Sequence, residues 1–376
     1  MKLLLSPDSF KGSLSSIEVI DCLEKVAKKH FSPIEIIKVP IADGGEGTVD
    51  ALTLMKKGQF HWVEVTGPLG SKVKAKYGII NNKTAVIEMA QASGLPLLEA
   101  HEKNPLLTTT YGTGELIKAV LNEGIRDIII GIGGSATNDG GIGAIQALGV
   151  KLTDVNNKEI GWGGKELANI HNINLESLDY RIKESSITVI CDVNNPLTGK
   201  NGATVIFGPQ KGATNEILEL LEKGMQHYAE VIREQLGVDP DKIPGAGAAG
   251  GLGAALCCFL GAQLKKGIDT ILDFADFDNL LEDVDLVVTG EGRIDGQSIF
   301  GKVPVGIARR CKAKSVKVVA IAGSMGENAQ LVYDYGIDSI MPIVNRDMSL
   351  EEAMARSVEL LTDAADRMFR FIKVLR

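Results

Sequence analysis

Residues 284–322, VDLVVTGEGRIDGQSIFGKVPVGIARRCKAKSVKVVAIA, decide the expected fold. They contain an apolar run at 284–289, a helical pattern at 303–313 with a proline near its first turn, and a second apolar run at 316–322. Nearly all-apolar strands that alternate with helices are typical of a parallel sheet covered on both faces. This stretch therefore predicts a doubly wound α/β domain.

The same alternation is found at both ends of the chain. The further elements expected there are strands at 2–6, 34–39 and 337–344 and helices at 15–30, 47–57, 327–335 and 350–374. Two N-terminal strands cannot make a stable sheet alone, whereas the three C-terminal strands bring the total to five. We therefore expect residues 1–60 and 280–376 to form one discontinuous, Rossmann-like domain.

The middle of the chain, residues 61–279, follows a different pattern. The expected strands are 60–65, 72–80, 84–90, 127–132 and 187–192, and the expected helices are 114–122, 141–148 and 213–235. Asn81-Asn82-Lys83 between two of these strands is a hairpin signal. This pattern predicts a second α/β domain with a mixed sheet, inserted into the first.

Composition excludes several classes of protein. Forty Lys and Arg against 48 Asp and Glu give a net charge of −8, so broad binding of nucleic acid is not expected. The five cysteines form no C-x-x-C pair, which indicates reduced thiols and a cytoplasmic location. The uncharged stretch 245–264 is too rich in glycine for a membrane span, and the N-terminus lacks the apolar core of a signal peptide. We expect a monomer or homodimer with no membrane partner.

Polar clusters follow the predicted strands of the first domain. They are residues 8–13 (DSFKGS), 43–48 (DGGEGT), 290–297 (GEGRIDGQ), 323–324 (GS) and 345–347 (NRD). Ligands bind outside the carboxyl ends of the strands in open parallel sheets. Such loops are polar in many proteins, but acids and cations mixed with glycines in three of them favour a binding site.

A glycine-rich stretch, residues 131–141 (GIGGSATNDGG), lies between a predicted strand and a predicted helix. Glycines let a ligand approach the backbone, and a helix N-terminus favours an anion, so we expect either phosphate contact or a tight structural turn. Gly131, Gly133 and Ala136, with Asp154 further on, also fit a short dinucleotide fingerprint. An NAD(P)-dependent oxidoreductase is therefore an alternative, although no group for hydride chemistry accompanies the fingerprint.

Two other glycine motifs are incomplete. Residues 245–250 (GAGAAG) match the fingerprint literally, but a proline-containing loop precedes them where a strand is required, so packing and ligand contact are equally open. Residues 296–302 resemble a P-loop, but Val303 replaces the hydroxyl that binds Mg²⁺. Lys302 could still meet a phosphate at the start of the following helix.

The remaining chemistry suits phosphoryl transfer. There is no G-x-S-x-G motif, and the five histidines lie outside the glycine-rich clusters without metal-ligand spacing. Carboxylates, lysines, an arginine and glycine loops can position phosphates, neutralise charge with Mg²⁺ and accept a hydroxyl proton. A non-catalytic sensor could keep such a pocket, but it would not need several acids beside several cations.

Eight motifs occur along the chain, namely 8–13 (DSFKGS), 43–48 (DGGEGT), 133–141 (GGSATNDGG), 191–197 (CDVNNPL), 207–213 (FGPQKGA), 245–251 (GAGAAGG), 290–295 (GEGRID) and 301–304 (GKVP). Together they resemble the motifs of bacterial glycerate kinases of the type-1 family. The resemblance implies phosphorylation of D-glycerate by ATP with Mg²⁺, giving 2-phosphoglycerate, or 3-phosphoglycerate as the other product. It also implies two α/β domains with the active cleft between them.

Roles follow from the chemistry of two anionic reactants. We expect Asp295 to be the proton acceptor, with Asp192 as second candidate and Lys11 as a catalytic cation. The remaining expected contacts are Arg293, Ser9, Lys302 and Lys211 to the substrate, Gly133, Gly134, Ser135, Thr137 and Asn138 to the nucleotide, and Asp43 and Glu46 to Mg²⁺. Arg293 could hold the substrate carboxylate with both ends of its guanidinium, and Mg²⁺ could be held through waters.

Overall fold

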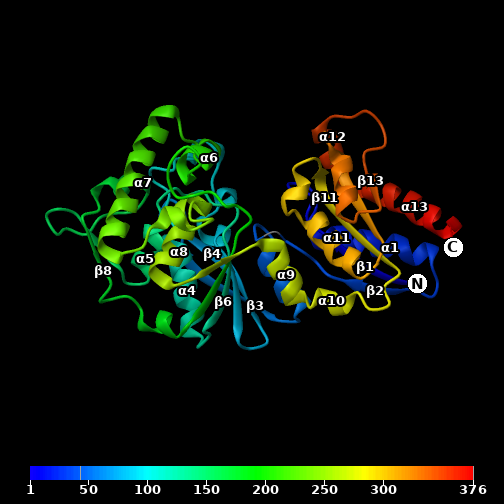
Figure 1. The fold of residues 1–376 in the computed structure, drawn as a ribbon, viewed down its shortest axis with the longest axis horizontal. Coiled ribbons are helices and arrows are strands. Elements are labelled where there is room, and N and C mark those ends of the chain that lie inside the picture. The colour runs from blue at the N-terminus through cyan, green and yellow to red at the C-terminus, as the bar shows by residue number, and fades with distance from the viewer. Residues whose placement is uncertain (43, 376) are drawn as a thin grey trace. The chain divides into compact units, whose positions relative to one another are not determined.

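The computed structural model in Figure 1 describes residues 1–42 and 44–375. The chain divides into two compact units. Unit 1 comprises Met1–Asp43, Asp50–Lys56 and Gly267–Arg376, and unit 2 comprises Gly44–Val49 and Lys57–Lys266. The division differs in detail from the predicted boundaries at 60 and 280. Gly44 belongs to unit 2 because its carbonyl accepts a hydrogen bond from the Gly133 amide at 3.1 Å, and Gly267 begins a helix of unit 1.

Unit 1 contains a five-stranded sheet in which every pairing is parallel. Its strands, in spatial order, are β13 (Ser339–Pro342), β12 (Val318–Met325), β11 (Leu286–Ile294), β1 (Lys2–Pro7) and β2 (Glu35–Lys38). The two N-terminal strands and three C-terminal strands join in one sheet, because β1 pairs with β11 in the centre. The predicted doubly wound parallel sheet is confirmed.

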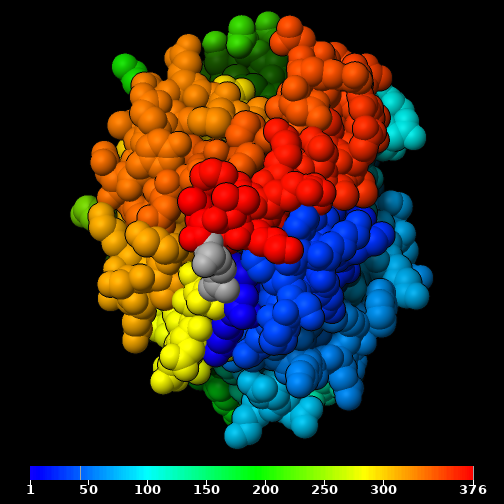
Figure 2. All heavy atoms as spheres, turned by 90° about the vertical axis from the view of Figure 1, so that its right-hand side faces the viewer, coloured from blue at the N-terminus to red at the C-terminus, as the bar shows by residue number. Residues whose placement is uncertain are grey.

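Helices cover both faces of this sheet. Helix α1 (Ser16–His30) begins with a capping box between Ser15 and Glu18 and buries an apolar stripe that includes Leu23. It packs with α13 (Ser357–Leu375) over the face that contains Leu3 and Val288, and Figure 2 shows the N-terminal and C-terminal segments side by side. Helix α11 (Val303–Ala313) contacts β11 and β1, and its Gly306 packs against Ile268 of α9 (Gly267–Ala275).

The remaining elements of unit 1 are short. They are α2 (Thr48–Met55), which begins in unit 2, α10 (Phe277–Leu280), α12 (Leu350–Ala355) and the 3₁₀ helices η8 (Ser298–Phe300) and η9 (Ala329–Tyr335). The single helix predicted at 350–374 is wrong in one respect: it is divided into α12 and α13 at Arg356, whose ψ of 16° is not helical. The helix expected at 327–335 is the shorter 3₁₀ helix η9, which starts after Asn328 in a left-handed conformation.

Unit 2 is built on a six-stranded mixed sheet (Figure 1). Its order is β10 (Gln263–Lys265), β9 (Ser186–Ile190), β6 (Asp127–Gly131), β5 (Thr84–Glu88), β4 (Lys72–Ile80) and β3 (Gln59–Thr66). The pairs β3–β4 and β4–β5 are antiparallel, and the other three are parallel. Asn81 and Asn82 both have φ of 52° in the predicted hairpin turn. The mixed sheet is therefore confirmed.

Helices and a small second sheet complete unit 2. These elements are α3 (Ala90–Ser93), α4 (Tyr111–Asn122), α5 (Ile142–Ala147), α6 (Ala203–Phe207), α7 (Asn215–Leu236), α8 (Leu252–Leu260) and the antiparallel strands β7 (Lys151–Thr153) and β8 (Asn172–Asn174). The 3₁₀ helices of this unit are η1 (Leu95–Leu97), η2 (Ala100–Glu102), η3 (Gly164–Asn169), η4 (Tyr180–Glu184), η5 (Pro209–Lys211), η6 (Pro240–Lys242) and η7 (Ala248–Gly251). Among the described residues, no helix combines the length and apolarity required to cross a bilayer.

Candidate active site

In unit 1, two of the predicted polar clusters lie at one edge of the sheet. Strand β1 ends where Pro7 pairs with Gly290 of β11, and the next amide, of Asp8, donates to the Gly290 carbonyl at 2.8 Å. A Cβ on Gly292 would lie 3.6 Å from the backbone nitrogen of Lys11. Residues 8–13 therefore fold directly against β11, as expected for loops at the carboxyl ends of parallel strands.

Strand β11 is longer than the sequence indicated. Residues 290–294, predicted as a loop, continue the strand because β12 extends beside them, with Arg293 opposite Ser324. Side chains alternate between the faces of a strand, so Glu291 and Arg293 project to the same side. The loop prediction was wrong here, because the polar residues that follow the apolar run 284–289 also pair with β12.

Two acids and two cations form a charge cluster around the end of β11. The Asp295 carboxylate lies 3.3 Å from Nε of Arg293 and 3.8 Å from Nζ of Lys302, and Lys302 also lies 3.4 Å from the Glu291 carboxylate. The Arg293 side chain is 64% exposed and that of Lys302 is 38% exposed, whereas Asp295 is 19% exposed. The cations can therefore meet an anionic ligand from solvent while Asp295 stays in place.

Asp295 is held by hydrogen bonds within the turn that follows it, and Ser298 of this turn is bonded to Glu291. The Asp295 carboxylate accepts a hydrogen bond from the Gln297 amide at 3.0 Å, and the Asp295 amide donates to the Ser298 hydroxyl at 3.2 Å. That hydroxyl donates to Glu291 at 2.9 Å. Glu291 was not among the predicted site residues, although the alternation Glu291-x-Arg293-x-Asp295 could have indicated it.

Burial raises the pKa of the Glu291 carboxyl, and Lys302 and Ser298 offset this only in part. A raised folded-state pKa means that the folded protein binds more protons than the unfolded chain above the ordinary value of 4.5, so stability falls as pH rises through that window. We therefore expect the difference in free energy of unfolding, Glu291→Gln minus wild type, to increase as the pH rises from about 4 to about 7.

Urea unfolding at several pH values measures this difference. Glu327→Gln, at an exposed position beside the same cluster, is the matched control. Parallel stability curves for the wild type and Glu291→Gln would show that burial of this carboxyl has no effect on the protonation of the folded state.

The other unit 1 candidates lie in the loop after β1. The Ser9 amide donates to the nearly buried Asp8 carboxylate at 2.7 Å, and Lys11 is exposed. Gly12 has φ of 75°, a left-handed conformation that favours glycine. The loop thus presents a hydroxyl and a cation beside β11.

The glycine-rich loop of unit 2 is packed into the protein over most of its length. The amides of Gly133 and Ala136 donate to the carbonyls of Gly44 and Ser93, and Gly134 accepts from the Leu95 amide. Only Gly133 and Gly134 of the predicted nucleotide contacts reach the surface. The Gly133 amide thus already has a hydrogen-bond partner within the protein. The backbone surface available to a phosphate is smaller than the motif suggested.

The other predicted nucleotide contacts point into the interior. Thr137 and Asn138 are fully buried, Ser135 is 7% exposed, and the side-chain amide of Asn138 donates to the Thr204 hydroxyl at 3.0 Å. Asp139, which follows them, accepts hydrogen bonds from the amide and hydroxyl of Thr110, both at 2.8 Å. The pKa of Asp139 is raised overall, because the effect of burial exceeds the opposing effect of these hydrogen bonds. The side chains of residues 135–139 therefore stabilise the loop from the protein interior.

Lys211, expected to meet the substrate, is inside unit 2. It is 1% exposed, and its Nζ donates to the Ser135 hydroxyl and to the Thr137 carbonyl, both at 2.7 Å. Burial lowers the pKa of Lys211 to about 7, with Asp139 acting in the opposite direction. Contact with a solvent-borne substrate is not available to this side chain, because it is enclosed by the loop that it supports.

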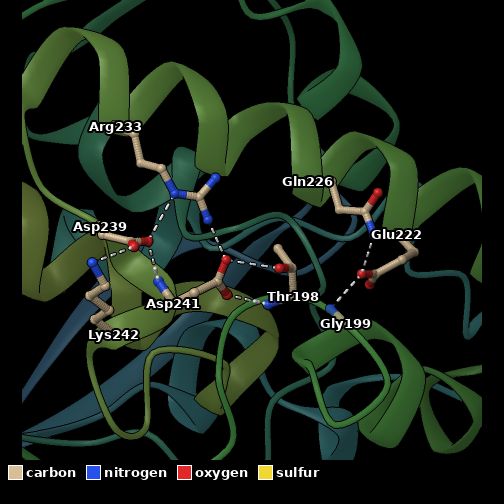
Figure 3. Close-up of polar contacts among 8 residues, drawn as sticks. All are labelled: Thr198, Gly199, Glu222, Gln226, Arg233, Asp239, Asp241 and Lys242. Atoms are coloured by element: carbon tan, nitrogen blue, oxygen red, sulfur yellow. Dashed lines mark hydrogen bonds and ion pairs between the residues drawn. The ribbon is translucent and has the colours of Figure 1, made fainter.

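Asp192, the second candidate base, is exposed in the loop that follows β9. Figure 3 shows how the far part of this loop is anchored: the amide and hydroxyl of Thr198 donate to Asp241, and the Gly199 amide donates to Glu222 of α7. Arg233 of α7 in turn holds Asp241 and Asp239. The anchored loop belongs to unit 2, and Asp295 belongs to unit 1.

The metal prediction is only partly covered by the structure. Asp43 lies outside the described residues, and Glu46 is exposed in the turn before α2. Within residues 1–42 and 44–375 there is no group of three or more His, Cys, Asp or Glu side chains arranged to hold a metal ion. An exposed carboxylate does fit Mg²⁺ as a cofactor, since this ion is usually held by one or two carboxylates, waters and substrate phosphates.

The dinucleotide fingerprint is not supported by its acidic residue. Asp154 accepts the amides of Asn156 and Lys158 at 2.8 and 2.9 Å, so it stabilises a turn after β7. The third predicted glycine motif, residues 245–251, packs on the 133–141 loop, where the Gly140 amide donates to the Gly250 carbonyl at 2.9 Å. Of the two readings left open for that motif, packing is what the structure shows.

Comparison with known proteins gives a consistent result. Residues 3–373 match the model of the Glycerate kinase family. The chain is 50% identical over 354 residues to glycerate 2-kinase of Escherichia coli (strain K12), covering 94% of this chain and 93% of that protein. It is 47% identical over 377 residues to glycerate kinase of Bacillus subtilis (strain 168), covering 100% and 99%.

A solved structure also resembles the whole chain. It is described as a candidate glycerate kinase 2 from Salmonella typhimurium LT2, shares 45% identity, and covers 100% of this chain and 98% of its own with a TM-score of 0.87. A family match over nearly the full length, relatives near 50% identity and a shared fold all point the same way. The chain belongs to the glycerate kinase family.

Proposed function

We propose that this enzyme transfers the γ-phosphate of ATP to the 2-hydroxyl of D-glycerate, with Mg²⁺, to give 2-phosphoglycerate. The observation that carries the proposal is the cluster in which Asp295 lies between Arg293 and Lys302. Membership of the glycerate kinase family favours a kinase over an oxidoreductase or a sensor, and one relative is named glycerate 2-kinase. The five free cysteines support a cytoplasmic location.

In this proposal, the unit 1 cluster binds and activates glycerate. The exposed guanidinium of Arg293 can hold the substrate carboxylate with two parallel hydrogen bonds, and Ser9 and Lys11 contribute a hydroxyl and a positive charge. Asp295 accepts the proton of the hydroxyl as its oxygen attacks phosphorus. Lys302 neutralises charge on the transferred phosphoryl group. Asp192 is the alternative proton acceptor.

The nucleotide is proposed to bind at unit 2, against the partly exposed Gly133 and the exposed backbone of Gly134. Ser135, Thr137 and Asn138 keep this backbone in place from the interior. Glu46, with Asp43 in the same glycine-rich motif, would hold Mg²⁺ through waters. The ion would supply neutralisation of the phosphate charges.

Product identification tests this function directly. After incubation with Mg·ATP and D-glycerate, phosphorus NMR is expected to show the resonance of 2-phosphoglycerate growing as that of the ATP γ-phosphate declines. The resonance of 3-phosphoglycerate in its place would correct the position of transfer. ATP that stays intact with glycerate, beside activity with NAD(P), would overturn the assignment.

Replacing Gly134 with valine is expected to raise the KM for ATP by roughly tenfold or more, the effect of losing one hydrogen bond to a charged group. A side chain on this exposed residue, whose φ is 74°, would keep phosphates away from the backbone. The KM for glycerate should stay unchanged in steady-state assays. Gly124→Val is the control, because Gly124 has φ of 79° and open space around it. Equal changes for both substrates would count against the nucleotide site.

A further inference from the structure

A buried lysine joins two distant parts of unit 2. Lys211 ends the 3₁₀ helix η5, and its Nζ donates hydrogen bonds to Ser135 and Thr137 of the glycine-rich loop, more than 70 residues away. The two acceptors flank Ala136, so the ammonium group spans this residue. The contact is therefore made to the loop itself and not to the rigid elements on either side of it.

The interior position of Lys211 is costly. Burying an amine away from water is unfavourable unless hydrogen bonds and charges compensate, and an apolar side chain of similar length would fill the same space without that penalty. The compensation here is two hydrogen bonds of 2.7 Å, and Asp139 opposes the effect of burial on the pKa of Lys211. An amine therefore adds a directional restraint on the loop that simple packing would not give.

The loop needs such a restraint because it has no regular secondary structure between β6 and α5. One side is tied to residues 93–95 by the Ala136 amide and the Gly134 carbonyl, and its end is tied by Asp139 to Thr110. Between these ties, the Thr108 hydroxyl donates to the Ala136 carbonyl at 2.9 Å, and Lys211 holds the residues on both sides of Ala136. Without Lys211, the segment that follows Gly133 and Gly134 would lose two of its interior hydrogen bonds.

We propose that Lys211 is a positioning residue, which uses its hydrogen bonds to Ser135 and Thr137 to hold Gly133 and Gly134 in the conformation that binds the phosphates of the nucleotide. The proposal rests on the proposed ATP site at these glycines. It assigns Lys211 no contact with substrate or nucleotide, and so replaces the substrate contact expected from the sequence. Preorganisation of the loop lowers the ordering cost of binding, so its loss appears mainly in nucleotide affinity.

The test uses Lys211→Met and Ser135→Ala in the full chain. Each is expected to raise the KM for ATP by roughly tenfold, with the KM for glycerate unchanged and kcat altered by less than about threefold. The double variant should be little worse than Lys211→Met alone, because both changes remove the same contact. Lys200→Met, at an exposed lysine of the same unit, is the control and should behave as the wild type.

Amide hydrogen exchange of ligand-free protein gives a readout that does not depend on catalysis. Exchange of residues 134–138 should be at least roughly tenfold faster in Lys211→Met than in the wild type, while the β6 and β9 amides keep their protection. Faster exchange with an unchanged KM for ATP would leave the restraint standing and overturn its role in nucleotide binding, while Gly134→Val tests the ATP site itself. Unchanged exchange would overturn the restraint itself.

The kinetic outcomes are equally decisive. An unchanged KM for ATP in Lys211→Met, or equal losses for ATP and glycerate, would overturn the positioning role. So would a double variant whose effect is the product of the two single effects. If Lys211→Met does not fold, Ser135→Ala decides, since removal of one hydroxyl leaves the lysine and the packing in place.

Discussion

Replacing Asp295 by asparagine is expected to lower kcat by roughly two orders of magnitude or more, with little change in the KM for either substrate. Asparagine has the same size and retains an oxygen that can accept the Gln297 amide, so the turn around residue 295 should persist. What it lacks is the ability to take the proton of the attacking hydroxyl. The loss should therefore fall on the chemical step, as steady-state and single-turnover kinetics can show.

Two further variants make this test specific. Asp347→Asn changes an exposed aspartate in the loop after β13 and should retain wild-type turnover. Asp192→Asn tests the alternative base, and a larger loss there than in Asp295→Asn would transfer the role to Asp192. Near wild-type turnover in Asp295→Asn would remove this carboxylate from the mechanism.

The fold was predictable where local pattern decides it. The apolar stripe of α1 and the serine before it predicted a helix at 15–30, and the helix is Ser16–His30. Buried strands such as Lys2–Pro7 read as short apolar runs, and counting them gave the five-stranded parallel sheet. These features depend on residues close in sequence, or on a count that topology restricts strongly.

Prediction from the sequence failed where contacts with a segment distant in the chain determine the local structure. Residues 290–294 extend β11 only because β12 continues beside them, which no local pattern reveals. Likewise, Lys211 looks like a surface cation until the fold encloses it behind Ser135 and Thr137. Glu291 was overlooked for a different reason: its contact with Ser298 is close in sequence, but it forms only once the turn after Asp295 is in place. The motifs located the region of the candidate site, whereas tertiary contacts determine which side chains are exposed in that region.

A comparison of two glycines offers the largest expected effect on stability. Gly250 and Gly237 have nearly the same φ, 66° and 68°, but different surroundings. A Cβ on Gly250 would lie 2.0 Å from the Thr137 carbonyl oxygen and 2.7 Å from the Cα of Asn138, whereas a Cβ on Gly237 would have nothing within 4 Å. The left-handed backbone penalises alanine at both positions by about 1–2 kcal/mol, and overpacking adds about 1–3 kcal/mol at Gly250 only.

We therefore expect Gly250→Ala to lower the free energy of unfolding by about 2–5 kcal/mol and Gly237→Ala by about 1–2 kcal/mol, out of a total of about 5–15 kcal/mol for a typical domain. Urea unfolding of the two variants measures both losses, and their difference isolates the clash with Thr137. Because Thr137 also accepts the hydrogen bond of Lys211, Gly250→Ala should raise the KM for ATP, and Gly237→Ala should not. Equal losses of stability in the two variants would mean that the 137–140 segment can yield to the extra methyl group, and that Gly250 is needed only for its backbone conformation.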